Sequence, residues 1–163
     1  MEHIDVIIVG AGLSGIGAAR QLQEKCPGKT FAILEGRDTI GGTWDLFRYP
    51  GIRSDSDMYT MGYDSKPWLD AKAIADGPAI LSYVKEAAEE RGLLNHIRFD
   101  HCVRSASWSS ENARWRVACE RADGSRTEVS CNVLFICSGY YNYDHGYTPE
   151  FAGMEDFSGD VVH

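Results

Sequence analysis

The 163-residue sequence contains few basic residues, and those few form no run. Sixteen Lys and Arg stand against 24 Asp and Glu, which gives a formal net charge of −8. A nucleic-acid surface needs clustered cations, so this class of partner is excluded. The sequence also lacks the roughly 18 consecutive apolar residues of a membrane-spanning helix. Its start, "MEHIDVIIVG", has an acidic residue before a short apolar run, which is not the pattern of a secretory leader.

Metal-binding motifs are missing as well. The five cysteines include no C-x-x-C, and the five histidines include no H-x-x-x-H. An odd number of cysteines with apolar, strand-like neighbours is typical of reduced, mostly buried thiols in a cytoplasmic protein. We therefore predict no metal site and a cytoplasmic location.

Apolar periodicity in the first part of the chain predicts a parallel α/β arrangement. Residues 4–10, "IDVIIVG", are a continuous β-branched run typical of a strand covered on both faces. Helical spacing follows over residues 13–26, with apolar side chains on one side and polar ones, Arg20 among them, on the other. Residues 30–35 read as a second strand, which completes a β-α-β unit with a parallel crossover.

The rest of the chain changes character several times. Residues 36–78 are irregular and rich in glycine and aromatic residues, and such a stretch inside a compact domain is usually functional. A helix is expected over 78–93. Four strand patterns follow between 96 and 132, and the turn "ADGS" predicts a hairpin between the last two, so we expect a small antiparallel meander. The apolar run 133–139 is expected to return to the parallel sheet as a further strand.

The first strand runs into "GAGLSG", a G-x-G-x-x-G motif at the start of the helix. Gly10 permits a tight turn, Gly12 lets a pyrophosphate approach the backbone, and Gly15 lets the helix lie close to the strand. The free N–H groups at the start of the helix suit phosphate groups. Ser14 can add a hydroxyl donor. This context predicts a Rossmann-like dinucleotide-binding domain.

An acidic residue ends the second strand. Glu35 stands twenty residues after Gly15, where a carboxylate accepts hydrogen bonds from the hydroxyls of an adenosine ribose. The same charge should repel a 2′-phosphate, so the site is predicted to hold FAD or NAD rather than NADP. The glycine pair 41–42, with a long aromatic loop after it, and the inserted meander both favour FAD.

Four stretches resemble the N-terminal FAD domain of flavin-dependent Baeyer–Villiger monooxygenases, of the bacterial ethionamide-activating type. They are "VIIVGAGLSGIGAA", "ILEGRDTIGGTWDLFRYPGIRSDSDMY", "FICSGYYNYD" and "FSGDVVH". The resemblance covers essentially all of the chain. Flavin-containing monooxygenases that oxidise nitrogen or sulfur share the first glycine motif and a related fingerprint, and they stay open as an alternative.

The last stretch carries the first part of that family's fingerprint, F-x-G-x-x-x-H-x-x-x-W, at Phe157, Gly159 and His163. The resemblance implies a two-dinucleotide-binding flavoprotein in which an FAD-binding domain at 1–150 leads through a connector at 151–163 toward an NADPH-binding domain. A second glycine motif is not in the sequence. We therefore expect a fragment that has no turnover by itself, with His163 as a connector residue.

The resemblance also implies the chemistry and the contacts. FAD and NADPH would be the cofactors, O₂ the oxidant, and a ketone or thio-compound the substrate of Baeyer–Villiger oxidation or S-oxygenation. Arg53, Ser54 and Asp55 would face NADP, and Asp55 would support an active-site arginine that this chain lacks. The FAD contacts carried over by motif match are Gly10, Gly12, Ser14, Gly15, Glu35, Gly42, Thr43, Trp44, Asp55, Val103 and Gly139.

Two functions of other classes fit the same residues. One is an NAD-binding oxidoreductase without flavin. The other is a flavin- or nucleotide-binding module with no chemistry of its own. Flavin absorbance of the protein separates the first of these from a flavoprotein, because an NAD-binding protein is colourless.

Overall fold

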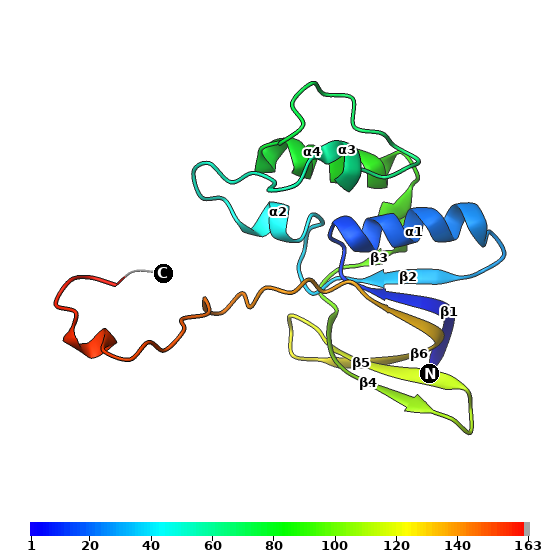
Figure 1. The fold of residues 1–163 in the computed structure, drawn as a ribbon. Helices are drawn as coiled ribbons and strands as arrows, with labels where there is room; N and C mark the ends of the chain where they lie inside the picture. Colours follow the sequence, from blue (N-terminus) through cyan, green and yellow to red (C-terminus); the bar gives the residue numbers. More distant parts are fainter. Residues whose placement is uncertain (162–163) are drawn as a thin grey trace.

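The computed structural model describes residues 1–161 and contains a six-stranded sheet of order β3-β2-β1-β6-β5-β4 (Figure 1). β1 (Glu2–Val9) lies at its centre and pairs in parallel with β2 (Phe31–Leu34) and β6 (Arg126–Ile136). β3 (Ile97–Arg98) extends the parallel part beside β2. The predicted fold class, a Rossmann-like α/β domain with an added antiparallel meander, is confirmed.

Two helices cover one face of the parallel strands. α1 (Leu13–Lys25) follows β1 directly, and α4 (Gly77–Glu89) packs beside it (Figure 1). α4 begins where the sequence predicts, because the Asp76 carboxylate accepts the Ala79 N–H at 3.0 Å and a proline stands in the first turn. The core between helices and sheet is mostly aliphatic, and its fully buried residues include Ile8, Ile16, Ile33, Ile80 and Val84.

The segment predicted as irregular contains two single-turn helices, α2 (Thr43–Leu46) and α3 (Met58–Met61). Short 3₁₀ turns, η1 (Leu93–His96) and η2 (Met154–Asp156), complete the helical elements of the described residues. α3 has its own cap, since the Asp57 carboxylate accepts the Thr60 N–H at 2.9 Å. This hydrogen bond lowers the pKa of Asp57.

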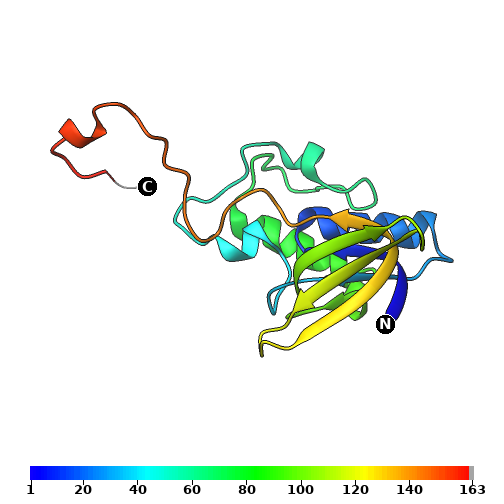
Figure 2. The same ribbon diagram turned by 90° about the horizontal axis from the view of Figure 1, so that it is seen from below.

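The meander consists of β4 (Cys102–Ser109), β5 (Arg114–Glu120) and the first half of β6. It lies far from α1 and α4 in Figure 1, and in front of the helices in the view from below (Figure 2). The expectation of two strands, one ending the meander and one in the parallel sheet, is wrong. β6 is a single strand whose Val129 and Cys131 pair with β1 on one side and β5 on the other. Thr127, Val129 and Cys131 alternate with polar residues, an apolar run follows over 133–136, and no Gly or Pro stands between 126 and 136, which explains why no break occurs.

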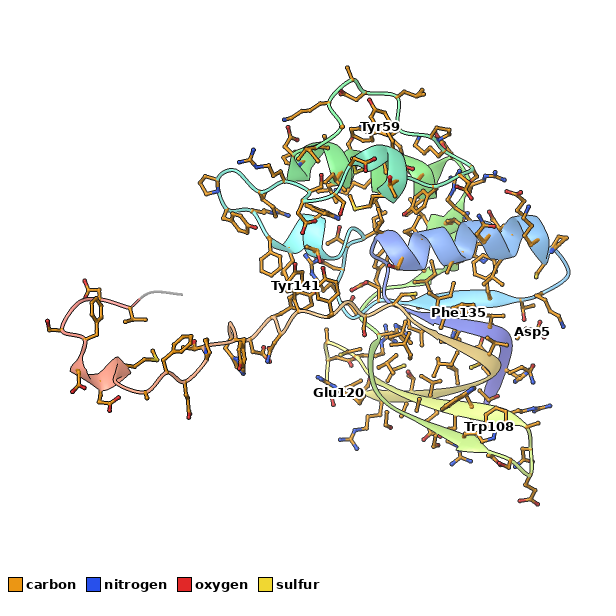
Figure 3. All side chains as sticks on the ribbon, viewed as in Figure 1. Asp5, Tyr59, Trp108, Glu120, Phe135 and Tyr141 are labelled. Atoms are coloured by element: carbon orange, nitrogen blue, oxygen red, sulfur yellow. The ribbon has the colours of Figure 1, made fainter. Side chains whose placement is uncertain are left out.

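The second half of β6 is less buried than its apolar sequence predicts. Val133 pairs with Val6 and Phe135 with Ile8, so these side chains lie on the helical face of the sheet. Their exposed fractions are 45% and 43%, because α1 and α4 cover β1 and β2 but do not reach over β6 within the described residues (Figure 3). A parallel strand is ordinarily covered on both faces, so the exposure of these two side chains departs from the usual pattern.

Arg20 also departs from the prediction. The helical pattern assigned it to the polar side of the helix, yet it is 2% exposed. Its guanidinium donates to the carbonyl of Ala87 at 2.6 Å and to the carbonyl and hydroxyl of Ser65 at 3.1 and 3.0 Å. It also lies 5.8 Å from the centre of the Tyr63 ring. These partners come from α4 and from the loop after α3, which cover α1 on the side where solvent was expected.

Substitution of Arg20 tests this network. Arg20→Met should lower the free energy of unfolding by about 2 kcal/mol, because the buried carbonyl of Ala87 and the partly buried carbonyl of Ser65 lose their donor, while a cation no longer has to be desolvated. Urea unfolding followed by far-UV circular dichroism measures the change. Gln21→Met, one residue along on the exposed side of α1, is the control and should stay within about 0.5 kcal/mol of the unsubstituted chain. Equal stability of the two variants would contradict the network's role.

Beyond β6 the chain is extended and leaves the sheet (Figure 1). Phe157 and Gly159 of the fingerprint lie in this segment, and Phe157 is 63% exposed. His163, assigned as a connector residue, lies outside the described residues. The division at residue 150 stays a prediction.

Every helix within 1–161 is too short or too polar to cross a lipid bilayer. The five cysteines are free: Cys119 and Cys131 are buried, Cys102 and Cys137 are half-buried, and Cys26 is exposed.

Candidate functional site

The glycine motif forms the connection between β1 and α1. Gly10 has φ +101°, a conformation that L side chains rarely adopt, and a Cβ there would lie 2.5 Å from the carbonyl oxygen of Cys137. Gly15 lies so close to the end of β1 that a Cβ would lie 1.9 Å from the Gly10 oxygen. Both glycines are therefore required by the chain's own packing. Ser14 is exposed in the first turn of α1.

Gly12 differs from these two glycines. Its φ and ψ of −82° and −169° are open to any residue, and a Cβ would meet only Gly42, at an ordinary contact distance of 3.6 Å. Gly12 is also the N-cap of α1, and no side chain caps the helix there. The first N–H groups of α1 thus have no side-chain partner. The space that a Cβ on Gly12 would take is not filled by other atoms of the protein.

Glu35 lies at the carboxyl end of β2, directly beside this turn. Its Oε2 accepts the N–H of Ala11 at 2.7 Å and its Oε1 accepts the N–H of Arg37 at 3.0 Å. The residue is 8% exposed. A carboxylate has about four acceptor positions, so two remain after these bonds. The structure therefore brings the predicted acid to the middle of the glycine motif.

The second glycine pair lies against the first motif. The Gly41 N–H donates to the Ala11 carbonyl at 3.0 Å, and the Gly42 Cα lies near the Gly12 Cα. Thr43 and Trp44 follow in α2, and Trp44 packs partly on the helical core. The sequence-predicted residues Gly12, Glu35 and Gly42 are thus brought together at one edge of the sheet.

The predicted NADP-facing residues lie in the loop before α3. Arg53 and Asp55 are exposed, whereas Ser54 is 3% exposed. The Ser54 hydroxyl accepts the Ala75 N–H at 3.2 Å, so it already has a partner within the loop. A contact with a second cofactor would therefore come from Arg53 or Asp55 rather than from a free Ser54 hydroxyl.

Asp55 lies near Tyr141, an exposed residue of the segment after β6. Tyr141 packs edge-on against Phe47 with ring centres 5.9 Å apart, which brings the segment after β6 to the loop after α2 (Figure 3). The neighbouring Tyr140 hydroxyl raises the pKa of Tyr141, and the negative charge of Asp55 adds to this effect. Asp55 itself accepts a hydrogen bond from the Ser56 hydroxyl at 3.4 Å.

The last two predicted contacts lie on other segments. Val103 is half-buried in β4, two residues after His101, whose N–H donates to the Glu35 carbonyl at 2.8 Å. Gly139 follows β6 with φ +78° and is exposed. Cys137 connects this end to the glycine motif, because its N–H donates to Val9 at 2.8 Å. Burial raises the pKa of the Cys137 thiol.

A charged pair that was not among the predicted site residues lies beside this edge. The guanidinium of Arg37 is hydrogen-bonded to the carboxylate of Asp45, which is 4% exposed. Arg37 and Asp45 flank the glycine pair in "GRDTIGGTWD", and opposite charges on both sides of a predicted turn were the available signal. That signal is weak by itself, because charged residues near loops are usually solvated.

A family model described as an NAD(P)-binding Rossmann-like domain matches residues 8–70. This range contains the glycine motif, Glu35, the glycine pair and the loop before α3. It agrees with the edge of the sheet at which the predicted residues meet.

Curated relatives and solved structures match nearly the whole chain. The FAD-containing monooxygenase EthA of Mycolicibacterium smegmatis is 57% identical over 162 residues, which is 99% of this chain and 33% of that protein. A steroid monooxygenase bound to NADP is 34% identical with a TM-score of 0.76, over 99% of this chain and 30% of that one. OTEMO in complex with FAD and NADP is 28% identical with a TM-score of 0.74, over 96% and 29%. The chain spans about a third of the length of the curated relatives it matches.

Proposed function

We infer that the chain belongs to the family of FAD-containing monooxygenases, and we propose that it is the FAD-binding part of an NADPH- and O₂-dependent monooxygenase. The residues that would hold FAD are those at the sheet edge: the glycine motif, Glu35 and the glycine pair. The reaction we propose for the whole enzyme is Baeyer–Villiger oxidation of a ketone, with S-oxygenation of a thio-compound as the second possibility.

The main support for the proposal is that a glycine stands at position 12 although a larger residue would fit there. Backbone conformation and internal packing explain the glycines at 10 and 15, but neither explains the glycine at 12, where the chain itself leaves room for a Cβ. A bound diphosphate does explain it, because a phosphate must approach the backbone N–H groups at the start of α1 closely.

Glu35 fits the adenosine ribose of the same ligand. The two backbone N–H donors fix its carboxylate beside Ala11 while two acceptor positions stay free, enough for two ribose hydroxyls. When bound, FAD would supply the electron transfer and oxygen chemistry of the enzyme. The described residues would bind and orient it, and Arg53 and Asp55 would face the nicotinamide cofactor.

Substitution of Gly12 separates ligand binding from folding. Gly12→Ala should leave the free energy of unfolding without ligand within about 0.5 kcal/mol, because its Cβ meets no close neighbour. The same methyl group should raise the Kd for FAD by roughly 10- to 100-fold, because it occupies space needed by the diphosphate. Titration of the chain with FAD, followed by quenching of flavin fluorescence, measures the Kd.

Gly28→Ala is the control, since a Cβ at Gly28 has no neighbour within 4 Å and the position is remote from the motif in sequence. An unsubstituted chain that bound NAD tightly and FAD not at all would overturn the flavin assignment in favour of a nicotinamide-binding protein. Equal FAD affinity of Gly12→Ala and Gly28→Ala would show that the diphosphate does not bind at this turn.

A further inference from the structure

Arg37 connects the two halves of the proposed FAD site. Its backbone N–H donates to Glu35 Oε1 at 3.0 Å, at the adenosine end. Its guanidinium reaches across to α2, where it is hydrogen-bonded to the Asp45 carboxylate and lies 3.4 Å from the Gly42 carbonyl. One residue therefore contacts both the acid that would bind ribose and the turn that would lie beside the flavin half of the ligand.

Asp45 requires a cation at this place. Its side chain is 4% exposed, and a buried carboxylate is stable only when it is paired. Two arginines approach it: Arg37, whose side chain is 34% exposed, and Arg48, whose side chain is 74% exposed at an N–O distance of 3.2 Å. The better-buried partner is less screened by water, so Arg37 contributes more to holding Asp45.

The turn that this pair holds has an unusual backbone. Gly41 and Gly42 have φ of +117° and +54°, and a Cβ on Gly41 would lie 3.1 Å from the Asp45 Cβ. The N–H groups of Asp45 and Leu46 donate to the Gly42 carbonyl at 3.1 and 3.0 Å. A shift of Asp45 therefore shifts the turn, which lies against Gly12.

We infer that Arg37 and Asp45 are positioning residues that fix the distance between the ribose-binding carboxylate and the Gly41–Trp44 turn. Neither side chain is required to touch the ligand. They act by holding the Glu35 carboxylate and the Gly41–Trp44 turn at a fixed distance from each other. This inference rests on the proposed FAD site. It extends that site to a pair of charges outside the glycine motif.

Binding of two ligands to the chain tests the pair. ADP occupies only the adenosine and diphosphate half, whereas FAD also uses the turn. Arg37→Met should raise the Kd for FAD by about 10-fold, the effect of losing one charge-assisted hydrogen bond, and should change the Kd for ADP by less than about threefold. Asp45→Asn should give the same pattern, and Arg37→Lys, which keeps the charge, should recover part of the FAD affinity.

Arg48→Met is the matched control, because Arg48 contacts the same carboxylate from an exposed position. It should change neither Kd by more than about threefold. The double variant Arg37→Met/Asp45→Asn should lose no more FAD affinity than either single variant, as expected for two residues that act through each other. Arg37→Lys and Asp45→Asn still decide the question if Arg37→Met does not fold.

Three results would overturn the inference. Equal loss of ADP and FAD affinity would show that Arg37 acts on the adenosine half of the site or on the stability of the whole domain. If neither affinity falls, the Arg37–Asp45 pair has no role in binding the ligand. An unsubstituted chain that bound ADP but not FAD would refute the proposed flavin site, and the inference with it, whereas normal FAD binding with unaffected variants would refute the inference alone.

Discussion

Glu35→Arg should abolish tight FAD binding. The Glu35 carboxylate has two acceptor positions left for ribose hydroxyls, and each hydrogen bond to a charged group is worth about 1.5–3 kcal/mol. An arginine removes both acceptors, so the Kd for FAD should rise by more than about 100-fold. Calorimetric titration with FAD measures this change directly.

The same substitution affects folding, since the N–H groups of Ala11 and Arg37 lose the oxygens that accept them. Glu35→Gln is therefore measured beside it, because it keeps the shape and one acceptor oxygen and should show a smaller loss of FAD affinity. Glu111→Arg gives the same change of net charge at an exposed residue and should leave the Kd unchanged. An unchanged Kd in a folded Glu35→Arg protein would refute the ribose assignment.

Gly15→Ala should lower the free energy of unfolding by about 3 kcal/mol or more, the largest stability effect expected in this chain. Its Cβ would lie 1.9 Å from the Gly10 carbonyl oxygen and 3.0 Å from the carbonyl carbon. These are backbone atoms and cannot rotate away, so α1 has to move from the end of β1. Overpacking usually lowers the free energy of unfolding by about 1–3 kcal/mol, and a clash that displaces backbone lies at the upper end of this range.

Urea unfolding compares Gly15→Ala with Gly12→Ala, three residues earlier in the same motif. The first variant should be strongly destabilised without any ligand, and the second should not be. This contrast is the direct test of the statement that one glycine serves packing and the other serves a ligand. A free energy of unfolding for Gly15→Ala within 1 kcal/mol of the unsubstituted chain would show that the helix adjusts easily.

The parts of the fold that sequence predicted well are those with a single strong pattern. The β-branched run at β1, the glycine motif and the capped start of α4 each have one physical explanation, and each is found close to the predicted residues. Glu35 was placed correctly for the same reason, because spacing from the motif fixes where β2 ends.

The failures involve partners that are distant in sequence. Arg20 looked exposed because helical periodicity does not show that Ser65 and Ala87 cover that side of α1. The division of β6 into two strands failed because a strand pattern carries no information on its neighbours. Arg37 and Asp45 were missed because their pairing depends on the turn between them. The functional assignments of Val103, Gly139 and the NADP-facing loop stay predictions.

The unbroken β6 has a consequence for how this domain unfolds. Val129 and Cys131 belong to the parallel and the antiparallel part at once, through hydrogen-bonded neighbours on both sides. The meander therefore cannot detach as an independent unit while the central sheet persists. Residues 129–131 of β6 pair with both β1 and β5, so unfolding of this part of β6 breaks both pairings. Amide protons of β1 and β5 should accordingly exchange with solvent in one cooperative opening rather than in two.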